Sequence, residues 1–213
     1  MTSFRRGAVR VTVPATSANL GPGFDSFGLA LARYDEVTAE VVDEGLTVEA
    51  AGESADAVPR DETHLVVASM LAAFRRWGGE PPGLRVQCRN AIPHGRGMGS
   101  SAAAIVAGVE AARRLLDGEG IAAGEALGLA AELEGHPDNV AAALAGGLTL
   151  AWTERETVRS LRLEPHRSVR PVVCVPGWPM STDTARGLLP DQVPYRDAVF
   201  NASRSGLLVA ALT

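Results

Sequence analysis

The strongest chemical signal in the sequence is a glycine-rich segment, residues 94–101, which ends in Ser100 and Ser101. Its glycines stand at the alternate positions 95, 97 and 99. Because glycine has no Cβ atom, such a backbone can turn tightly and bring its N–H groups against an anion. Apolar residues at helical spacing follow, so the serines are predicted to begin a helix whose dipole favours negative charge. The segment is therefore predicted to cradle a polyphosphate, with a glycine-rich turn that binds nothing as the alternative.

The sequence contains no lysine, and all 20 basic residues are arginine. The glycine segment cannot be a Walker A motif, because that motif needs a lysine for the phosphates. It is not a Rossmann fingerprint either, because Ser100 stands where the third glycine is required. Schiff-base and protein-kinase chemistry are excluded by the same absence. What remains is an ATP loop that acts through a helix dipole and hydroxyl groups.

A second candidate binding segment lies near the N-terminus, where glycines and a proline surround Asn19 and Asp25. An amide and a carboxylate on a loop of small residues could hold a hydroxyl and an ammonium group. The same two side chains could instead only cap turns, as Asn and Asp often do. The residues alone leave both interpretations open.

Hydrophobic periodicity predicts the elements that must position these segments. Alternating apolar residues indicate strands, and apolar residues three or four apart indicate helices. The order strand, glycine loop, helix around residues 84–116 is the order expected of a phosphate site. The predicted strands are 9–13, which ends at Pro14, 37–41 and 46–48, which form a hairpin, 84–88, 147–152 and 169–175. The predicted helices are 65–77, 105–116, 125–133, one that begins at Pro137, and 198–212.

The composition is that of an ordinary globular protein, with 213 residues of which 46% are hydrophobic and 21% are charged. Disordered and fibrous classes are therefore excluded. The net charge is −5 and no stretch gathers the arginines into a stripe, so no nucleic-acid partner is expected. Apolar runs fall short of the ~18 residues that span a membrane, and no apolar leader follows Arg6. We predict a cytoplasmic protein with no membrane partner.

The cysteines and the last segment give two further predictions. Cys88 and Cys174 each lie in an alternating apolar run, which predicts small buried residues in strands rather than a disulfide. Residues 198–212 have an apolar helical pattern without a cap or a polar tail. We therefore expect a C-terminal portion to follow and cover them.

Three motifs in order carry a family resemblance. Residues 93–103, Pro-His-Gly-Arg-Gly-Met-Gly-Ser-Ser-Ala-Ala, are similar to the ATP-binding motif of the GHMP kinases, the superfamily of galactokinase, homoserine kinase, mevalonate kinase and phosphomevalonate kinase. Met98 stands where leucine is usual. Residues 14–29 resemble the first motif of the homoserine kinases, and residues 134–140 with the glycines 146 and 147 resemble their middle motif. A shorter match, residues 181–186, resembles their segment that meets the amino-acid substrate.

The resemblance implies an α+β fold in two parts. Residues 1–160 would form a GHMP-kinase-type N-terminal α/β domain (ribosomal protein S5 domain 2-like), which binds ATP. Residues 161–213 would form the incomplete beginning of a ferredoxin-like C-terminal domain. The implied activity is ATP-dependent phosphorylation of the side-chain hydroxyl of L-homoserine to O-phospho-L-homoserine, a step of threonine biosynthesis. The implied cofactor besides ATP is Mg²⁺, and the resemblance also allows a homodimer. A related kinase for another small alcohol and a non-catalytic ATP-binding module remain alternatives, because a fold does not fix a function.

The resemblance also assigns residues to each ligand. Mg²⁺ would be held by Ser101 and Glu132, while Glu134 would face solvent. Asn139 stands where mevalonate-type members have an aspartate base, and because an amide cannot accept a proton, the implied mechanism relies on positioning and charge neutralisation, with the proton passing to phosphate or solvent. The catalytic residues would be Asn139, Asp25 and Arg186. The homoserine-binding residues would be Asn19, Asp25, His136, Asn139, Thr182 and Arg186. The ATP-binding residues would be Pro93, Gly95, Arg96, Gly97, Met98, Gly99, Ser100, Ser101, Ala102 and Ala103, with His64 and Leu65 at the adenine.

Overall fold

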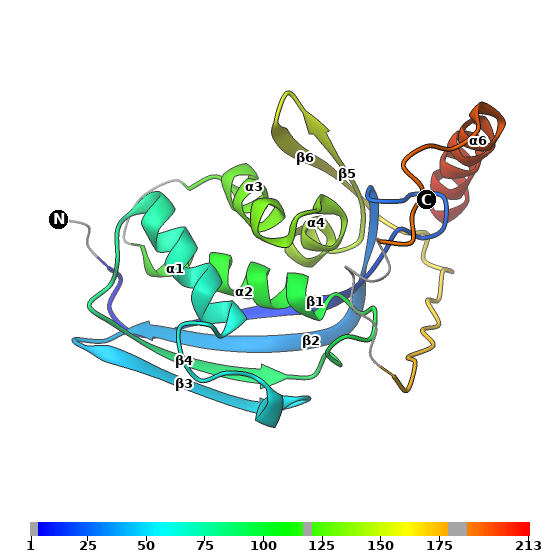
Figure 1. Ribbon diagram of the computed structural model, residues 1–213. Coiled ribbons are helices and arrows are strands. Elements are labelled where there is room, and N and C mark those ends of the chain that lie inside the picture. The colour runs from blue at the N-terminus through cyan, green and yellow to red at the C-terminus, as the bar shows by residue number, and fades with distance from the viewer. Residues whose placement is uncertain (1–3, 117–120, 179–186) are drawn as a thin grey trace.

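The computed structural model describes residues 4–116, 121–178 and 187–213, and its centre is one mixed β-sheet (Figure 1). Within the described residues the sheet has six strands, in the order β3-β4-β2-β5-β6, with β1 paired to β2 beside this path. The strands are β1 (Val9–Ala18), β2 (Phe27–Val41), β3 (Gly45–Gly52), β4 (Gly83–Asn90), β5 (Leu148–Glu154) and β6 (Thr157–Leu163).

The first strand is longer than predicted. It continues past Pro14 to Ala18, and its pairing with β2 changes register between Pro14 and Ala15. Proline has no N–H to donate to the ladder, so it is tolerated at such an irregularity rather than ending the strand. The extension carries the start of the first motif into the sheet, and Thr16 is completely buried there.

The predicted hairpin between residues 37–41 and 46–48 is wrong, because β4 lies between the two strands. β4 pairs antiparallel with β2 and parallel with β3, so that Leu84 stands opposite both Val41 and Leu46. A parallel pair needs a long crossover connection, and the helix α1 (Leu65–Trp77) provides it. The alternating buried residues of β4 suit this inner position.

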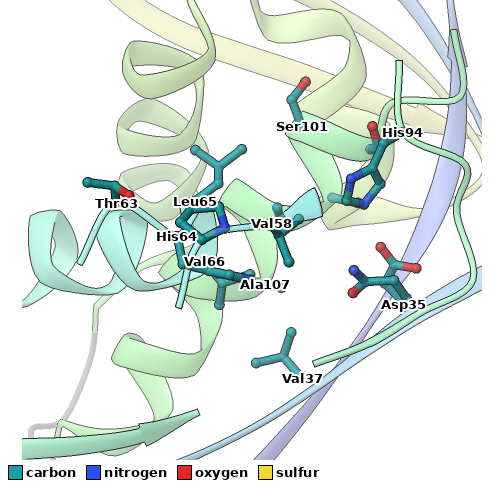
Figure 2. Close-up of a pocket in the computed structure, with 15 residues that line it drawn as sticks. Asp35, Val37, Val58, Thr63, His64, Leu65, Val66, His94, Ser101 and Ala107 are labelled. Atoms are coloured by element: carbon teal, nitrogen blue, oxygen red, sulfur yellow. The ribbon is translucent and has the colours of Figure 1, made fainter. Parts of the chain in front are cut away.

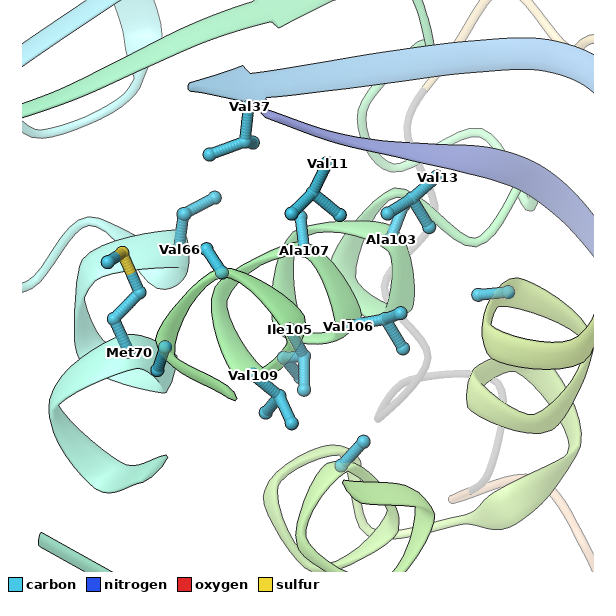
Figure 3. Packing of buried hydrophobic residues seen from close by; sticks show 14 of the residues in the cluster. Val11, Val13, Val37, Val66, Met70, Ala103, Ile105, Val106, Ala107 and Val109 are labelled. Atoms are coloured by element: carbon cyan, nitrogen blue, oxygen red, sulfur yellow. The ribbon is translucent and has the colours of Figure 1, made fainter. Parts of the chain in front are cut away.

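Four helices cover one face of the sheet, with α2 in the middle (Figure 1). Their bounds are α1 as above, α2 (Ser100–Leu115), α3 (Ala123–Glu134) and α4 (Pro137–Ala145). Figure 3 shows Val11 and Val13 of β1 directed at Ala103 and Ala107 of α2. At Gly108 a Cβ atom would lie 2.4 Å from the carbonyl oxygen of Val66, so α1 and α2 pack backbone to backbone. This packing fixes the position of α2, while its first residues, Ser100 and Ser101, are half-buried and exposed, respectively.

The last part of the described chain departs most from prediction. Residues 169–175 form no strand and Cys174 is exposed, whereas Cys88 is buried in β4 as predicted and both thiols are free. The final helix, α6 (Tyr195–Leu212), has no buried residue. β6 continues the sheet to Leu163, so the predicted domain boundary at 160 falls inside a strand. No helix in the described ranges is long and apolar enough to cross a membrane.

Candidate active site

The phosphate loop, residues 94–99, passes through left-handed backbone at each glycine, with φ of 64° at Gly95, 72° at Gly97 and 66° at Gly99. Helix α2 begins directly afterwards at Ser100, as predicted. No side chain caps this terminus, and the first N–H groups of a helix have no intrahelical partner. Loop and helix terminus together therefore offer several backbone donors to one anion.

The phosphate loop also carries a cation and is anchored to the sheet. Nη1 of Arg96 is buried and lacks a hydrogen-bond partner among the residues that the structure describes. An unsatisfied buried donor costs free energy, which an anion at the loop would offset. The carbonyl of Met98, a buried residue, accepts the N–H of Thr16 at 3.0 Å and so ties the loop to β1.

The hydroxyl of Ser101 donates to Oε1 of Glu134 at 2.7 Å. Glu134 is the last residue of α3, and its side chain is only 9% exposed. Burial raises the pKa of this carboxyl, while the hydrogen bond from Ser101 and the nearby His136 oppose that rise. A carboxylate at the C-terminal end of a helix is also disfavoured by the helix dipole. The charged form of Glu134 therefore lacks stabilisation that a cation would supply.

The predicted pairing of Ser101 with Glu132 is wrong. Glu132 is exposed and lines a different groove, together with Trp77 and Arg159. Residues two apart in a helix point about 200° apart around its axis, so only one of the two glutamates of α3 can meet Ser101. The structure shows that this one is Glu134, for which the sequence predicted the solvent-facing position.

The N-terminus of α4 presents a short chain of polar contacts. Oδ1 of Asp138 lies 2.7 Å from Nδ1 of His136 and also accepts the N–H of Asn139 at 2.7 Å. The side chain of Asp138 is 1% exposed, and Nε2 of His136 lies 3.9 Å from Oε1 of Glu134. His136 is thus oriented by Asp138, another residue of the middle motif, and it links α4 to the Ser101–Glu134 pair.

The side chain of Asn139 is held by a hydrogen bond from strand β1 of the sheet. The hydroxyl of Thr16 donates to Oδ1 of Asn139 at 2.7 Å. The pair lies beneath the phosphate loop, since a Cβ atom on Gly99 would stand 1.9 Å from Oγ1 of Thr16 and 3.0 Å from Oδ1 of Asn139. Sequence reasoning missed Thr16. The signal that could have found it is a polar residue inside the first motif, directly after the buried alternation of β1.

The loop of the first motif is built from unusual backbone. Asn19, Leu20 and Asp25 have left-handed φ values of 68°, 45° and 56°, which are uncommon for residues other than glycine and cluster at functional sites. Oδ1 of Asn19 accepts the N–H of Asp25 at 2.9 Å, so the asparagine does organise the loop, as the turn-capping interpretation expects. The carbonyl of Pro22 accepts the hydroxyl of Ser205 at 2.6 Å, so α6 lies against this loop.

A cavity of about 280 Å³ adjoins the phosphate loop (Figure 2). His64 and Leu65 line it together with Ser100 and Ser101, so the structure brings the predicted adenine residues beside the start of α2. His64 is 4% exposed, and neither ring nitrogen has a hydrogen-bond partner in the described part of the chain. Burial lowers the pKa of His64, and the positive charges of Arg60 and His94 lower it further.

Asp35 lies on another wall of this cavity, and one oxygen of its carboxyl is held by the backbone. Its Oδ1 accepts the N–H groups of Ala91 and Ile92 at 2.6 and 2.9 Å. Burial nevertheless raises the pKa of its carboxyl. Asp35 thus fixes the segment that leads from β4 into the phosphate loop. The remaining predicted site residues, Thr182 and Arg186, lie outside the described residues.

Comparison with known proteins identifies the family. The homoserine kinase of Streptomyces coelicolor is 57% identical over 213 residues, which cover 99% of this chain and 69% of that protein. The chain belongs to the homoserine kinase family. A second member, from Mycobacterium tuberculosis, is 48% identical over 208 residues, covering 94% of this chain and 66% of that homoserine kinase. The family model described as "GHMP kinases N terminal domain" matches residues 64–147, from the predicted adenine residues to the end of the middle motif.

Solved structures of homoserine kinases have the same fold. That of Cytophaga hutchinsonii gives a TM-score of 0.79 at 31% identity, covering 96% of this chain and 67% of that one. A putative homoserine kinase of Listeria monocytogenes gives 0.75 at 32% identity, with 97% and 68% covered. A mevalonate kinase of L. major complexed with R-mevalonate gives a TM-score of 0.56 at 17% identity, and it shares the fold alone. The match covers 76% of this chain and 55% of that kinase. The expected mixed α+β, GHMP-type architecture is confirmed.

Proposed function

We propose that this chain supplies the ATP-binding part and a share of the substrate pocket of an enzyme that transfers the γ-phosphoryl group of ATP to the side-chain hydroxyl of L-homoserine. The chain spans about two thirds of the length of its curated relatives, 69% of the Streptomyces coelicolor protein. The contact between Ser101 and Glu134 at 2.7 Å carries the proposal, because it joins a hydroxyl and a carboxylate at an anion-binding helix terminus.

The ATP site extends from the cavity to the phosphate loop. Adenine would lie against His64 and Leu65, and the phosphates would lie at residues 93–103, where backbone N–H groups, the helix dipole and Arg96 oppose their charge. The arrangement suits a nucleotide because the cavity opens onto Ser100 and Ser101. Residues 1–160, with the end of β6 to Leu163, would form this domain, and the residues after β6 would begin the next one.

The donor set at Ser101 and Glu134 fits Mg²⁺. Both donors are oxygens, and Glu134 is a buried carboxyl whose charged form a cation would stabilise. Among the described residues no group of three or more His, Cys, Asp and Glu side chains could hold a metal. One or two protein oxygens, with phosphates and waters for the rest, is the usual arrangement for Mg²⁺. When bound, the ion would neutralise charge on the transferring phosphoryl group.

Homoserine would be held between the first and middle motifs. Asn19 and Asp25 would bind its ammonium and hydroxyl groups, and His136, fixed by Asp138, would face the same site. Arg186 with Thr182 would neutralise its carboxylate, since a guanidinium matches that group bidentately. Asn139 can align the hydroxyl but cannot take its proton. Catalysis would therefore rest on alignment and charge neutralisation.

An ADP-release assay on the full-length protein tests this function. With ATP and Mg²⁺ we expect turnover with L-homoserine and none above background with mevalonate, shikimate or galactose. Turnover with one of the other alcohols would instead support a related kinase. ATP binding without turnover on all four alcohols would support the non-catalytic module.

A further inference from the structure

We propose that Thr16 is a positioning residue for the phosphoryl transfer, whose hydroxyl fixes the orientation of the Asn139 amide. This inference rests on the proposed function of Asn139. Thr16 is completely buried, and its hydroxyl donates to Oδ1 of Asn139 at 2.7 Å across 123 residues of sequence. The contact joins the end of β1 to the first turn of α4, the two elements from which the first and middle motifs extend.

The direction of this hydrogen bond decides what Asn139 can do. An amide has an acceptor end and a donor end, which exchange places when the group rotates by half a turn. Because Oδ1 accepts the proton of Thr16, the donor end, Nδ2, is the end left for substrate. Nδ2 would then donate to the hydroxyl oxygen of homoserine and hold its lone pair in line with the γ-phosphate. In the reversed orientation, Oδ1 would face the substrate and accept a hydrogen bond from the hydroxyl of homoserine, so that no amide N–H would donate to the hydroxyl oxygen.

The surroundings place this pair where such control matters. The backbone N–H of Thr16 donates to the carbonyl of Met98 at 3.0 Å, so the same residue also holds the phosphate loop. Gly99 passes directly over the pair, with space for no Cβ atom. The pair therefore lies against the loop that would bind the phosphates. An error of about 1 Å in such alignment can cost about 10²-fold in rate.

Substitutions at Thr16 in the full-length protein test the proposal. Thr16→Ala removes the donor without adding an atom, Thr16→Val removes it while keeping the side-chain shape, and Thr16→Ser keeps it. We expect kcat to fall about 10- to 100-fold in the first two variants, with KM for ATP changed less than about 3-fold, and to stay within about 3-fold of wild type in Thr16→Ser. If the valine methyl disturbs the loop, Thr16→Ala still carries the test.

A double-mutant cycle with Asn139→Ala separates positioning from packing. If Thr16 acts through Asn139, Thr16→Ala should cost less than about 3-fold in kcat once the amide is gone. Thr149 offers a matched control, because it is equally buried and its hydroxyl donates to the carbonyl of Gly28 at 3.3 Å. We expect Thr149→Val to keep kcat within about 3-fold of wild type.

Three results would overturn the positioning role: near-wild-type kcat in Thr16→Ala, an equal loss in Thr16→Ser, or losses from Thr16→Ala and Asn139→Ala that multiply. Each of these leaves the proposed function standing if the wild-type enzyme phosphorylates homoserine. A wild-type enzyme that fails to do so would instead refute the proposed function.

Discussion

Replacing Glu134 by glutamine should nearly abolish phosphoryl transfer while leaving the fold intact. The amide can still accept the hydroxyl proton of Ser101, so the local contact at 2.7 Å is kept. What the variant loses is one negative charge at the proposed Mg²⁺ site. Glu134 is therefore a position where activity and stability can be separated.

The size of the loss follows from burial and charge. Two unit charges about 4 Å apart interact with about 4 kcal/mol at the effective dielectric typical of protein surfaces. Removing one group that stabilises charge in a transition state commonly costs about 10²- to 10³-fold in kcat, or about 2.7–4 kcal/mol. The side chain of Glu134 is 9% exposed, so little water is present to replace the lost charge. We expect kcat to fall by about 10²- to 10³-fold.

Stability should move in the opposite direction. Burial raises the pKa of Glu134, so its charged form is less stable in the folded protein than it would be in water. A neutral glutamine avoids that cost. The free energy of unfolding of Glu134→Gln, measured by urea denaturation at pH 7, should therefore be no lower than that of the wild type.

Glu132→Gln is the matched control, because it makes the same chemical change two residues away on the exposed side of α3. ADP release at saturating homoserine and Mg²⁺ should be near normal in this variant. Calorimetry with ATP in the presence of a chelator adds a second measurement, in which Glu134→Gln should bind metal-free ATP more tightly than the wild type does. Equal turnover in the two variants, or weaker metal-free binding in Glu134→Gln, would refute the assignment.

Three further predictions concern the phosphate loop, the cavity and the thiols. Gly99→Ala should lower the free energy of unfolding by about 1–3 kcal/mol more than Gly97→Ala in urea denaturation, because both backbones are left-handed but a Cβ atom meets another residue only at 99. The pKa of His64 is lowered below 6.5, so the folded state binds fewer protons than the unfolded state; stability should fall as pH drops below about 6.5, and His64→Gln should remove part of this slope. Cys174 is exposed whereas burial raises the pKa of Cys88 to about 12, so a thiol reagent should titrate one equivalent in the native protein and two after unfolding.

Local patterns predicted the parts of the site that are contiguous in sequence. The alternate glycines and the helix starting at Ser100 are properties of one short segment, and the structure has them as predicted. The span of α1 likewise follows from apolar spacing and the glycines that end it. The hairpin prediction was wrong because strand pairing is not a property of one short segment. The residues between two strands do not show that a third strand, β4, enters between them.

Contacts between distant segments were beyond the sequence. Glu132 and Glu134 differ by two positions, and the packing of α3 against α2 decides which of them meets Ser101. The Thr16–Asn139 contact joins residues 123 apart, and nothing local to either predicts the other. Residues 169–175 alternate as a strand should, yet no strand in the described part of the chain pairs with them. Alternation of apolar residues indicates that a segment could form a strand, while strand pairing depends on whether another strand lies beside it.

The charges around the site indicate how the proposed phosphate site would work without a lysine. Glu134 contacts Ser101 at the start of α2, and His136 links Glu134 to Asp138, so the acidic side chains on this wall add negative charge rather than oppose it. Among the described residues, attraction for a polyphosphate would come chiefly from the backbone of the phosphate loop, from the dipole of α2 and from the guanidinium of Arg96, whose Nη1 is buried without a partner in this part of the chain. If Glu134 holds Mg²⁺ as proposed, its carboxylate would make the site selective for phosphates that arrive with a divalent cation. Metal-free nucleotide would meet the charge of Glu134 directly, and a buried carboxylate beside a phosphate is strongly disfavoured.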